Sequence, residues 1–209
     1  MWSDRVKRGF DLAVAIPAFV LTLPVQAVIA ALVARTLGRP VFFRQRRPGL
    51  HGEPFELIKF RTMRPVDPSR AHNDDASRMT PLGSKLRATS LDELPTLLNI
   101  IRGDMSLVGP RPLLMQYLGR YDADQARRHE VRPGLTGLAQ VSGRNAIEWE
   151  RKLELDVEYV DQRSLRLDLR ILALTARQVL RREGITAPGE ATTTEFMGSG
   201  PLRGPAGAA

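Results

Sequence analysis

The sequence predicts an α+β protein, in which a re-entrant N-terminal membrane helix, broken by proline, precedes a mostly helical domain with a small β-hairpin. An uncharged apolar run of 23 residues, Leu12 to Ala34, indicates the membrane helix. Two β-type segments around a Pro-Gly turn indicate the hairpin, and helical spacing of apolar residues indicates the rest. The predicted organisation is a membrane-associated segment (1–38), a folded domain (39–185) and a disordered tail (186–209).

The composition restricts the kinds of site that the chain can form. With 209 residues, 43% of them hydrophobic, it is long enough for one packed domain and an anchor. It contains no cysteine, which excludes disulfides and thiolate metal sites. Its three histidines, His51, His72 and His129, have no paired spacing. A bound metal should therefore be a hard cation on carboxylate oxygens.

The apolar run fits a re-entrant helix, a kinked spanning helix or a buried core helix. As a helix it would rise about 34 Å, enough to cross the ~30 Å hydrocarbon core. Pro17 and Pro24 each remove a backbone donor, and Pro24 lies at the middle of the run. A helix broken there can enter one leaflet and return, with Thr22 and Gln26 available to the freed backbone groups. We therefore favour the re-entrant helix over the other two.

Basic residues flank the apolar run on both sides. The net charge of the chain is +8, and residues 1–47 hold eight basic and two acidic residues. The positive-inside rule assigns both flanks to the cytoplasm, and anionic lipid headgroups attract such segments. A solvated basic face is the alternative, and nucleic acid is a weaker interpretation because no aromatic residues interleave with the basic ones. The eight are Arg5, Lys7, Arg8, Arg35, Arg39, Arg44, Arg46 and Arg47.

Local patterns predict the elements of the folded domain. Residues 40–47 and 54–62 should pair as a hairpin, and a polar loop should follow over 64–81. Helices are predicted over residues 82–102, 113–128 and 146–182, the last with a break near Ser164.

An adjacent carboxylate pair, Asp92 and Glu93, lies where a helix should begin. Residues 90–93 fit a capping box, in which Ser90 caps the helix and Glu93 reaches back to it. Pro95 would fit the first helical turn better if Asp92 were the cap. In either arrangement Asp92 lies at a positive helix end, where a phosphate also binds favourably. The pattern alone leaves capping and catalysis both open.

A rigid turn, Gly109-Pro110-Arg111-Pro112, follows the carboxylate pair. Its prolines restrict the backbone around Arg111, which limits the entropy lost when the guanidinium grips a phosphate or carboxylate. The alternative is a rigid loop with an exposed arginine. Further cations stand on a predicted strand and in Gly-containing turns, and the set suits a diphosphate substrate. These cations are Lys59, Arg61, Arg132 and Arg144.

Eight short motifs follow one another between residues 5 and 182. They are Lys7–Asp11, Lys59–Met63, Ser90–Pro95, Gly103–Pro112, Pro133–Gly137, Gly143–Asn145, Leu155–Val160 and Asp168–Ile171. In this order they resemble the small monotopic phosphoglycosyl transferases of bacteria, the bacterial sugar transferase family. The chain is most similar to the short subgroup that has only the catalytic domain.

The resemblance implies transfer of a phosphosugar from a UDP-sugar to polyprenyl (undecaprenyl) phosphate, with release of UMP. The reaction would take place at the cytosolic face of the bacterial inner membrane, as the first membrane step of glycoconjugate or exopolysaccharide assembly. By the same resemblance Asp92 would be the nucleophile, forming a covalent phosphosugar intermediate, and a ligand of Mg²⁺, with Glu93 as its catalytic partner. A carboxylate can act in this way because an acyl phosphate divides one displacement into two.

The resemblance also implies which residues bind substrate, and it shows one departure. The family often has Ser-Pro at the membrane-helix break, whereas this chain has Leu23-Pro24, with Thr22 as the nearest hydroxyl. The substrate-binding residues would be Lys59, Arg87, Pro110, Arg111, Pro112 and Arg144.

Two other functions agree with parts of the sequence. A conventional membrane-associated glycosyltransferase would move only the sugar and release UDP. A non-enzymatic basic membrane scaffold would show no turnover and no dependence on Asp92. The sequence leaves the sugar and a homo-oligomeric state open, and it favours membrane lipid rather than nucleic acid as a partner.

Overall fold

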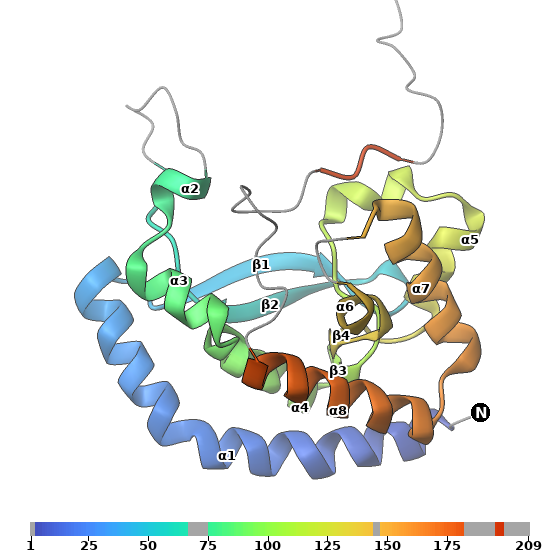
Figure 1. Cartoon of the computed structure of the whole chain (residues 1–209), viewed down its shortest axis with the longest axis horizontal. Helices are drawn as coiled ribbons and strands as arrows, with labels where there is room; N and C mark the ends of the chain where they lie inside the picture. Colours follow the sequence, from blue (N-terminus) through green and yellow to red (C-terminus); the bar gives the residue numbers. More distant parts are fainter. Residues whose placement is uncertain (1–2, 67–74, 144–146, 182–194, 199–209) are drawn as a thin grey trace, which may run out of the picture.

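The computed structural model describes residues 3–66, 75–143, 147–181 and 195–198. Arg144, part of the predicted loop and most of the predicted tail lie outside these ranges. Figure 1 shows the elements in order. They are α1 (Asp4–Leu37), β1 (Phe42–Pro48), η1 (Leu50–Gly52), β2 (Pro54–Phe60), α2 (Asp75–Arg78), α3 (Pro81–Ala88), η2 (Leu91–Thr96), α4 (Leu97–Arg102), β3 (Ser106–Val108), η3 (Met115–Arg120), α5 (Ala123–Ala126), η4 (Arg127–Glu130), β4 (Gly134–Thr136), α6 (Leu138–Ser142), α7 (Trp149–Gln162) and α8 (Leu165–Arg181).

The N-terminal helix α1 is continuous. Pro17 and Pro24 both lie inside it, and the helix bends as it passes beneath the domain and rises toward α3 (Figure 1). The predicted break at Pro24 is therefore wrong as an interruption, since the structure has a bend within one helix. Proline commonly produces such a bend because it removes one donor and crowds the preceding turn. Whether α1 re-enters the membrane stays a prediction.

Thr22 and Gln26 form a short chain of hydrogen bonds within α1. The hydroxyl of Thr22 donates to the carbonyl of Ala18 at 2.7 Å and accepts from Gln26 Nε2 at 3.0 Å. The carbonyl that loses its helical partner at Pro24 is that of Val20, four residues earlier. The same hydroxyl lies 3.1 Å from the carbonyl of Phe19, so it bonds carbonyls one and two residues before the freed group and not the freed group itself.

Most of α1 faces outward from the domain. By length and composition it could cross a membrane, and only 17% of its most apolar window is buried. A core helix would bury its large apolar side chains, so the core-helix alternative does not fit. Nine such side chains on α1 are 39–78% exposed, namely Val6, Val14, Ile16, Val20, Leu21, Leu23, Val25, Val28 and Leu32.

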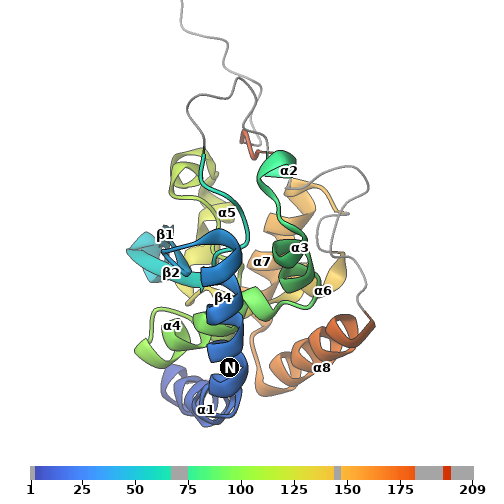
Figure 2. The same ribbon diagram turned by 90° about the vertical axis from the view of Figure 1, so that its left-hand side faces the viewer.

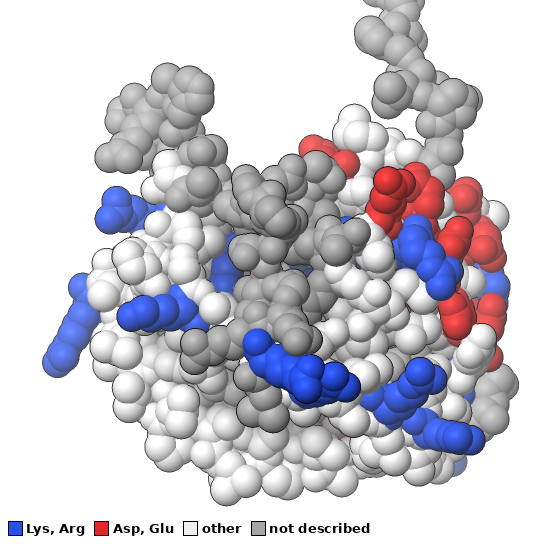
Figure 3. Space-filling view, viewed as in Figure 1, with Lys and Arg blue, Asp and Glu red and all other residues white. Residues whose placement is uncertain are grey.

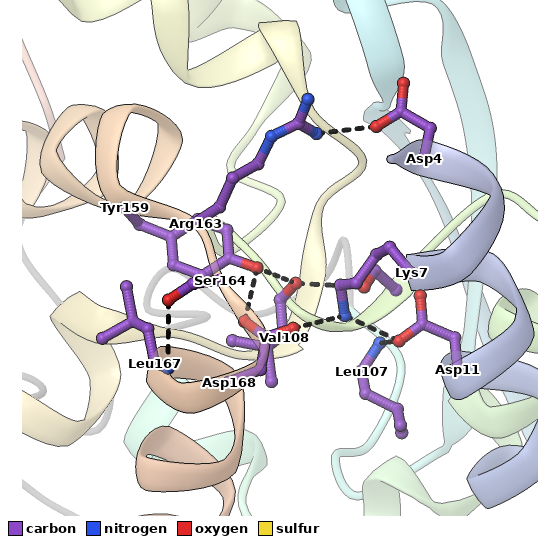
Figure 4. A network of polar contacts seen from close by, with 11 residues as sticks. Asp4, Lys7, Asp11, Leu107, Val108, Tyr159, Arg163, Ser164, Leu167 and Asp168 are labelled. Carbon is purple, nitrogen blue, oxygen red and sulfur yellow. Dashed lines mark hydrogen bonds and ion pairs between the residues drawn. The ribbon is translucent and has the colours of Figure 1, made fainter. Parts of the chain in front are cut away.

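A buried polar network ties the start of α1 to the domain (Figure 4). Lys7 Nζ lies 2.7 Å from Asp11 Oδ1 and 2.9 Å from Asp168 Oδ2 of α8. The hydroxyl of Tyr159 on α7 donates toward the other Asp168 oxygen at 2.9 Å. Asp11 also accepts from the amide of Leu107 on β3 at 3.2 Å. Four elements therefore meet at the first turns of α1.

Two arginines fix helix ends to neighbouring elements. Arg8 of α1 donates to the carbonyl of Ile101 at 2.7 Å, in the last turn of α4. Arg61, just after β2, donates to the carbonyl of Gly38 at 2.6 Å, directly after α1. The last carbonyls of a helix lack intrahelical partners, so cationic donors suit both positions. Both ends of α1 are consequently held by the same folded body.

The predicted hairpin is confirmed, and a second small sheet was not predicted. β1 and β2 pair antiparallel, with Phe42 opposite Phe60. β3 and β4 pair parallel, with Ser106 opposite Gly134. Each of these strands has only three residues, which is too short for alternation of apolar and polar residues to identify a strand in the sequence. The first residue of β4 must be glycine, since a Cβ at Gly134 would lie 2.1 Å from the amide nitrogen of Gly109.

The core lies between the helices that surround these sheets. Its least exposed side chains come from α1, α4, β3, α7 and α8, and from Met105 before β3. Figures 1 and 2 show α1 and α8 together at the base of the domain, on the side opposite α2 and the top of α7. The helices predicted over 146–182 are confirmed as α7 and α8, which are divided at Ser164.

The other predicted helices are divided into short pieces. Residues 82–102 form α3, η2 and α4, because Ser90 adopts a left-handed conformation (φ 56°) and Pro95 cannot donate. Residues 113–128 form η3, α5 and η4, of which none exceeds six residues. The expectation of a disordered tail does not hold for residues 195–198, where Phe196 is buried in the domain.

Candidate active site

The carboxylate pair lies on η2, a short 3₁₀ helix that leads into α4. The predicted capping box is wrong, since Ser90 makes no side-chain cap and Glu93 turns away from it. Two side chains tie the η2–α4 segment to the edge of β2. Thr96 Oγ1 donates to the carbonyl of Ile58 at 2.9 Å, and Asn99 Oδ1 accepts from the amide of the same residue at 3.1 Å. The pair is therefore fixed to a strand and not to a free helix end.

Glu93 holds two of the predicted substrate-binding cations. Its Oε1 lies 2.5 Å from Lys59 Nζ of β2 and 3.0 Å from Arg111 Nη2. These cations outweigh the effect of burial and lower the pKa of Glu93 to about 2. The same contact raises the pKa of Arg111, whereas burial lowers that of Lys59. Glu93 is therefore the ionised centre of a three-residue cluster.

Asp92 has a different environment from Glu93. It is 8% exposed, and burial followed by the charge of Glu93 raises the pKa of its carboxyl. Lys59, Arg87 and Arg111 lower it, but by less. Glu93 therefore opposes ionisation of Asp92, whereas the three cations favour it. Within the described residues the carboxylate has no hydrogen-bond or ion-pair partner, which distinguishes it from Glu93.

The Arg111 turn is held from behind by a buried arginine. Arg128, which is 2% exposed, donates to the carbonyl of Arg111 at 2.7 Å and pairs with Asp156 at 2.6 Å. Pro110 and Pro112 flank Arg111, whose side chain stays 47% exposed although it reaches Glu93. The backbone of Arg111 is therefore held in place, while the outer side of its guanidinium stays exposed to solvent.

Arg47 adds a cation that sequence reasoning did not place at the site. Its Nη1 lies 3.4 Å from the carbonyl of Pro112, and burial together with the charge of Arg111 lowers its pKa to about 10. Its position on the predicted hairpin gave no signal that separated it from its basic neighbours. Arg128 was likewise hidden in a run, Arg127-Arg128-His129-Glu130, that looks like solvated surface. Both depend on contacts between segments distant in sequence.

The remaining predicted cations have different positions. Arg87 on α3 donates to Thr62 Oγ1 at 3.1 Å and acts on Asp92 through its charge. Arg61 holds the end of α1, and Arg132 donates to the carbonyl of Gly103 at 2.9 Å, so both have structural partners away from the pair. Arg144 lies outside the described residues. The structure therefore brings Lys59, Arg111 and Arg87 to the carboxylate pair.

Binding of the Mg²⁺ expected from the sequence stays a prediction, and Asp92 is the residue that would hold it. In the described ranges no three His, Asp or Glu residues cluster as a ready metal cage. Mg²⁺ needs no such cage, because it commonly uses one or two carboxylates together with substrate phosphate oxygens. The buried Asp92 oxygens, which lack a cationic partner among those residues, suit that role.

The site and the order of the motifs agree with the results of sequence comparison. The pattern of the family described as "Bacterial sugar transferase" matches residues 2–182, and the chain belongs to that family. It is 54% identical over 196 residues to a Bacillus subtilis (strain 168) protein, the "Uncharacterized sugar transferase EpsL". That match covers 93% of this chain and 97% of the relative.

Other relatives have more specific descriptions. The Rhizobium meliloti (strain 1021) "Exopolysaccharide production protein ExoY" is 40% identical over 202 residues, 87% of this chain and 88% of its own. A Caulobacter vibrioides "UDP-glucose:undecaprenyl-phosphate glucose-1-phosphate transferase" is 40% identical over 189 residues, 85% of this chain and 70% of its own. These matches confirm the predicted family. They also confirm the resemblance to its short members, since the two short relatives align with this chain over most of their length.

Proposed function

We propose that this protein transfers a sugar 1-phosphate from a UDP-sugar to undecaprenyl phosphate or a related polyprenyl phosphate, giving polyprenyl-diphospho-sugar and UMP. The unequal environment of the two adjacent carboxylates carries the proposal. Glu93 is occupied by Lys59 and Arg111, whereas Asp92 keeps its oxygens available beside the same cations. The names of relatives that act on undecaprenyl phosphate support the substrate class.

Asp92 would react in two displacements. Its carboxylate oxygen attacks the phosphorus that bears the sugar, the bond from that phosphorus to the UMP oxygen breaks, and UMP leaves with the electron pair. A phosphate oxygen of the polyprenyl phosphate then attacks the same phosphorus and releases the Asp92 carboxylate. Arg111, with its open outer side, would bind the diphosphate during both steps. Glu93 would hold Arg111 and Lys59 in position for this task.

Mg²⁺ bound by Asp92 and by substrate phosphate oxygens would supply positive charge to the transferring group. The metal ion would also lower the raised pKa of Asp92, because a nearby cation favours the carboxylate anion that must attack.

The test is a reaction without acceptor. Purified enzyme given a UDP-sugar alone should release up to one UMP per site, and the peptide containing Asp92 should gain the mass of one phosphosugar. Asp92→Asn, which is nearly isosteric, should reduce turnover by several orders of magnitude and abolish the adduct. Release of UDP would instead establish the conventional glycosyltransferase, and absence of any turnover over a panel of UDP-sugars would favour the scaffold.

The same proposal places the domain on the cytosolic face of the inner membrane, with α1 entering and leaving from that face. Its two ends are held by Arg8 and Arg61 against one folded body, so a spanning helix would have to pull one end away. Figure 3 supports this orientation: Lys and Arg side chains form a band over α8, and the surface of α1 beneath it is largely uncharged. A basic band beside an apolar surface suits anionic headgroups.

A further inference from the structure

Residues 195–198 dock on the domain although the family match ends at residue 182. In Figure 1 this short segment lies at the top of the domain, above α5 and α7. Phe196 is 1% exposed, and its ring centroid lies 5.4 Å from that of Trp149 and 5.7 Å from those of Tyr117 and Tyr121. An aromatic side chain buried this completely contributes apolar packing to the domain.

Polar contacts hold the side chain of Glu195 and the backbone of Phe196 in the same segment. Glu195 Oε1 accepts from Gln116 Nε2 at 2.7 Å and from Arg120 Nη1 at 2.8 Å. The amide of Phe196 donates to the hydroxyl of Tyr117 at 3.3 Å, and its carbonyl accepts from Arg120. The surrounding side chains therefore contact the carboxylate of Glu195 and the ring, amide and carbonyl of Phe196.

The docked segment is linked to the Arg111 turn by direct contacts. The ring of Phe196 stacks on Tyr121 with an interplanar angle of 26°, and the hydroxyl of Tyr121 accepts from Arg128 Nη1 at 3.3 Å. Arg128 in turn donates to the carbonyl of Arg111 at 2.7 Å. In addition, η3, which supplies most of the polar contacts, begins three residues after Pro112. The docked segment thus packs against the support of the arginine proposed to bind diphosphate.

We propose that Glu195 and Phe196 form a positioning clip: the C-terminal segment docks on the domain and fixes Arg111 for binding of the UDP-sugar diphosphate. The clip touches no reacting atom and acts through Tyr121, Arg128 and η3. The role in substrate binding rests on the proposed function, whereas docking of the segment does not. Without the clip, Arg111 must be ordered at the moment of binding, so affinity for UDP-sugar falls more than the rate of the bound complex.

The kinetic test compares full-length variants. Phe196→Ala, and the double variant Glu195→Ala with Phe196→Ala, should raise KM for the UDP-sugar at least tenfold and change kcat less. Met197→Ala is the matched control, because Met197 is 62% exposed and, in the described structure, touches Arg120 only through its sulfur at 3.9 Å, and it should behave as the unaltered enzyme. A synthetic peptide of residues 192–200 should restore the KM of the double variant, and the same peptide with alanine in place of Phe196 should not. Rescue in trans separates a clip from general damage to the fold.

Trp149 gives a second readout that needs no turnover. The sequence has two tryptophans, so Trp2→Phe leaves Trp149 as the sole reporter. Its fluorescence should differ between the Trp2→Phe enzyme and the same enzyme carrying the double substitution, and the peptide should reverse the difference. Identical spectra and no response to peptide would overturn docking. A clear spectral response with unchanged KM would overturn the positioning role. Failure of the unaltered enzyme to transfer a phosphosugar would remove the proposed function and the positioning role, while the fluorescence titration would still decide docking.

Discussion

At the scale of single residues, the site depends on the contrast between Asp92 and Glu93. Burial and Glu93 raise the pKa of Asp92 above the ordinary value of 3.8, whereas Lys59 and Arg111 hold that of Glu93 near 2. Only the ionised Asp92 can attack, so kcat/KM should fall as the pH falls through the pKa of Asp92. The acid limb should therefore lie above the pH at which an unperturbed aspartate titrates.

Glu93→Gln should move this acid limb to lower pH. The substitution removes a negative neighbour and releases two cations, and both changes favour the Asp92 anion. The measurement is the pH dependence of single-turnover UMP release, with Glu56→Gln as control because Glu56 pairs only with the exposed Arg44 in the described structure. The variant should also be slower at every pH, since Lys59 and Arg111 lose their anchor. A limb that stays in place or moves upward contradicts the interpretation.

Arg111→Lys should separate a binding guanidinium from a structural one. Lysine keeps the charge but loses the planar fork, so kcat/KM should fall by roughly tenfold or more, about 1.4 kcal/mol. The fold should survive because the side chain of Arg111 is 47% exposed. Arg46→Lys, at an exposed position on β1, is the control and should leave the kinetics unchanged. Equal kinetics for both variants would show that the fork of Arg111 binds nothing in the reaction.

At the scale of elements, α1 is the part of the molecule that we propose to contact the membrane. Both its ends are attached to the same body, and its outer side chains are apolar. Arg5 and Arg39 are exposed near these two ends. Because the chain has no cysteine, Arg5→Cys and Arg39→Cys each give one clean label.

Both cysteines should be protected from an impermeant thiol reagent in intact cells and should react after permeabilisation. The physical reason is that a one-sided helix returns both basic flanks to the cytoplasm. Reaction of either cysteine from the outside of intact cells would favour the kinked spanning helix.

At the scale of the whole molecule, the composition restricts the metal that the proposed reaction could use. The chain has no cysteine and three scattered histidines, which leaves carboxylate oxygens such as those of Asp92. Activity should therefore be abolished by EDTA and restored by Mg²⁺ or Mn²⁺, with soft metals a poor substitute. UMP release in a coupled assay is the measurement. Full activity after rigorous chelation would remove the metal from the proposal.

The sequence by itself determined the elements with strong local patterns. The apolar run predicted α1, two β-type segments around a Pro-Gly turn predicted the hairpin, and helical spacing predicted α7 and α8 with the division at Ser164. The motifs also gave the family and named Asp92, Glu93, Lys59 and Arg111 together. These succeeded because periodicity and motif order are local properties of the chain.

Only the tertiary structure decided how those residues share their charges. Ser90 does not cap the helix because its backbone is left-handed. Glu93 pairs instead with Lys59 and Arg111, which lie 34 and 18 residues away in the sequence. The parallel pairing of β3 with β4, the support of Arg111 by Arg128, and the docking of Phe196 are likewise contacts between distant segments. Such contacts leave no period in the sequence, because each depends on the packing of the surrounding elements and not on the neighbours along the chain.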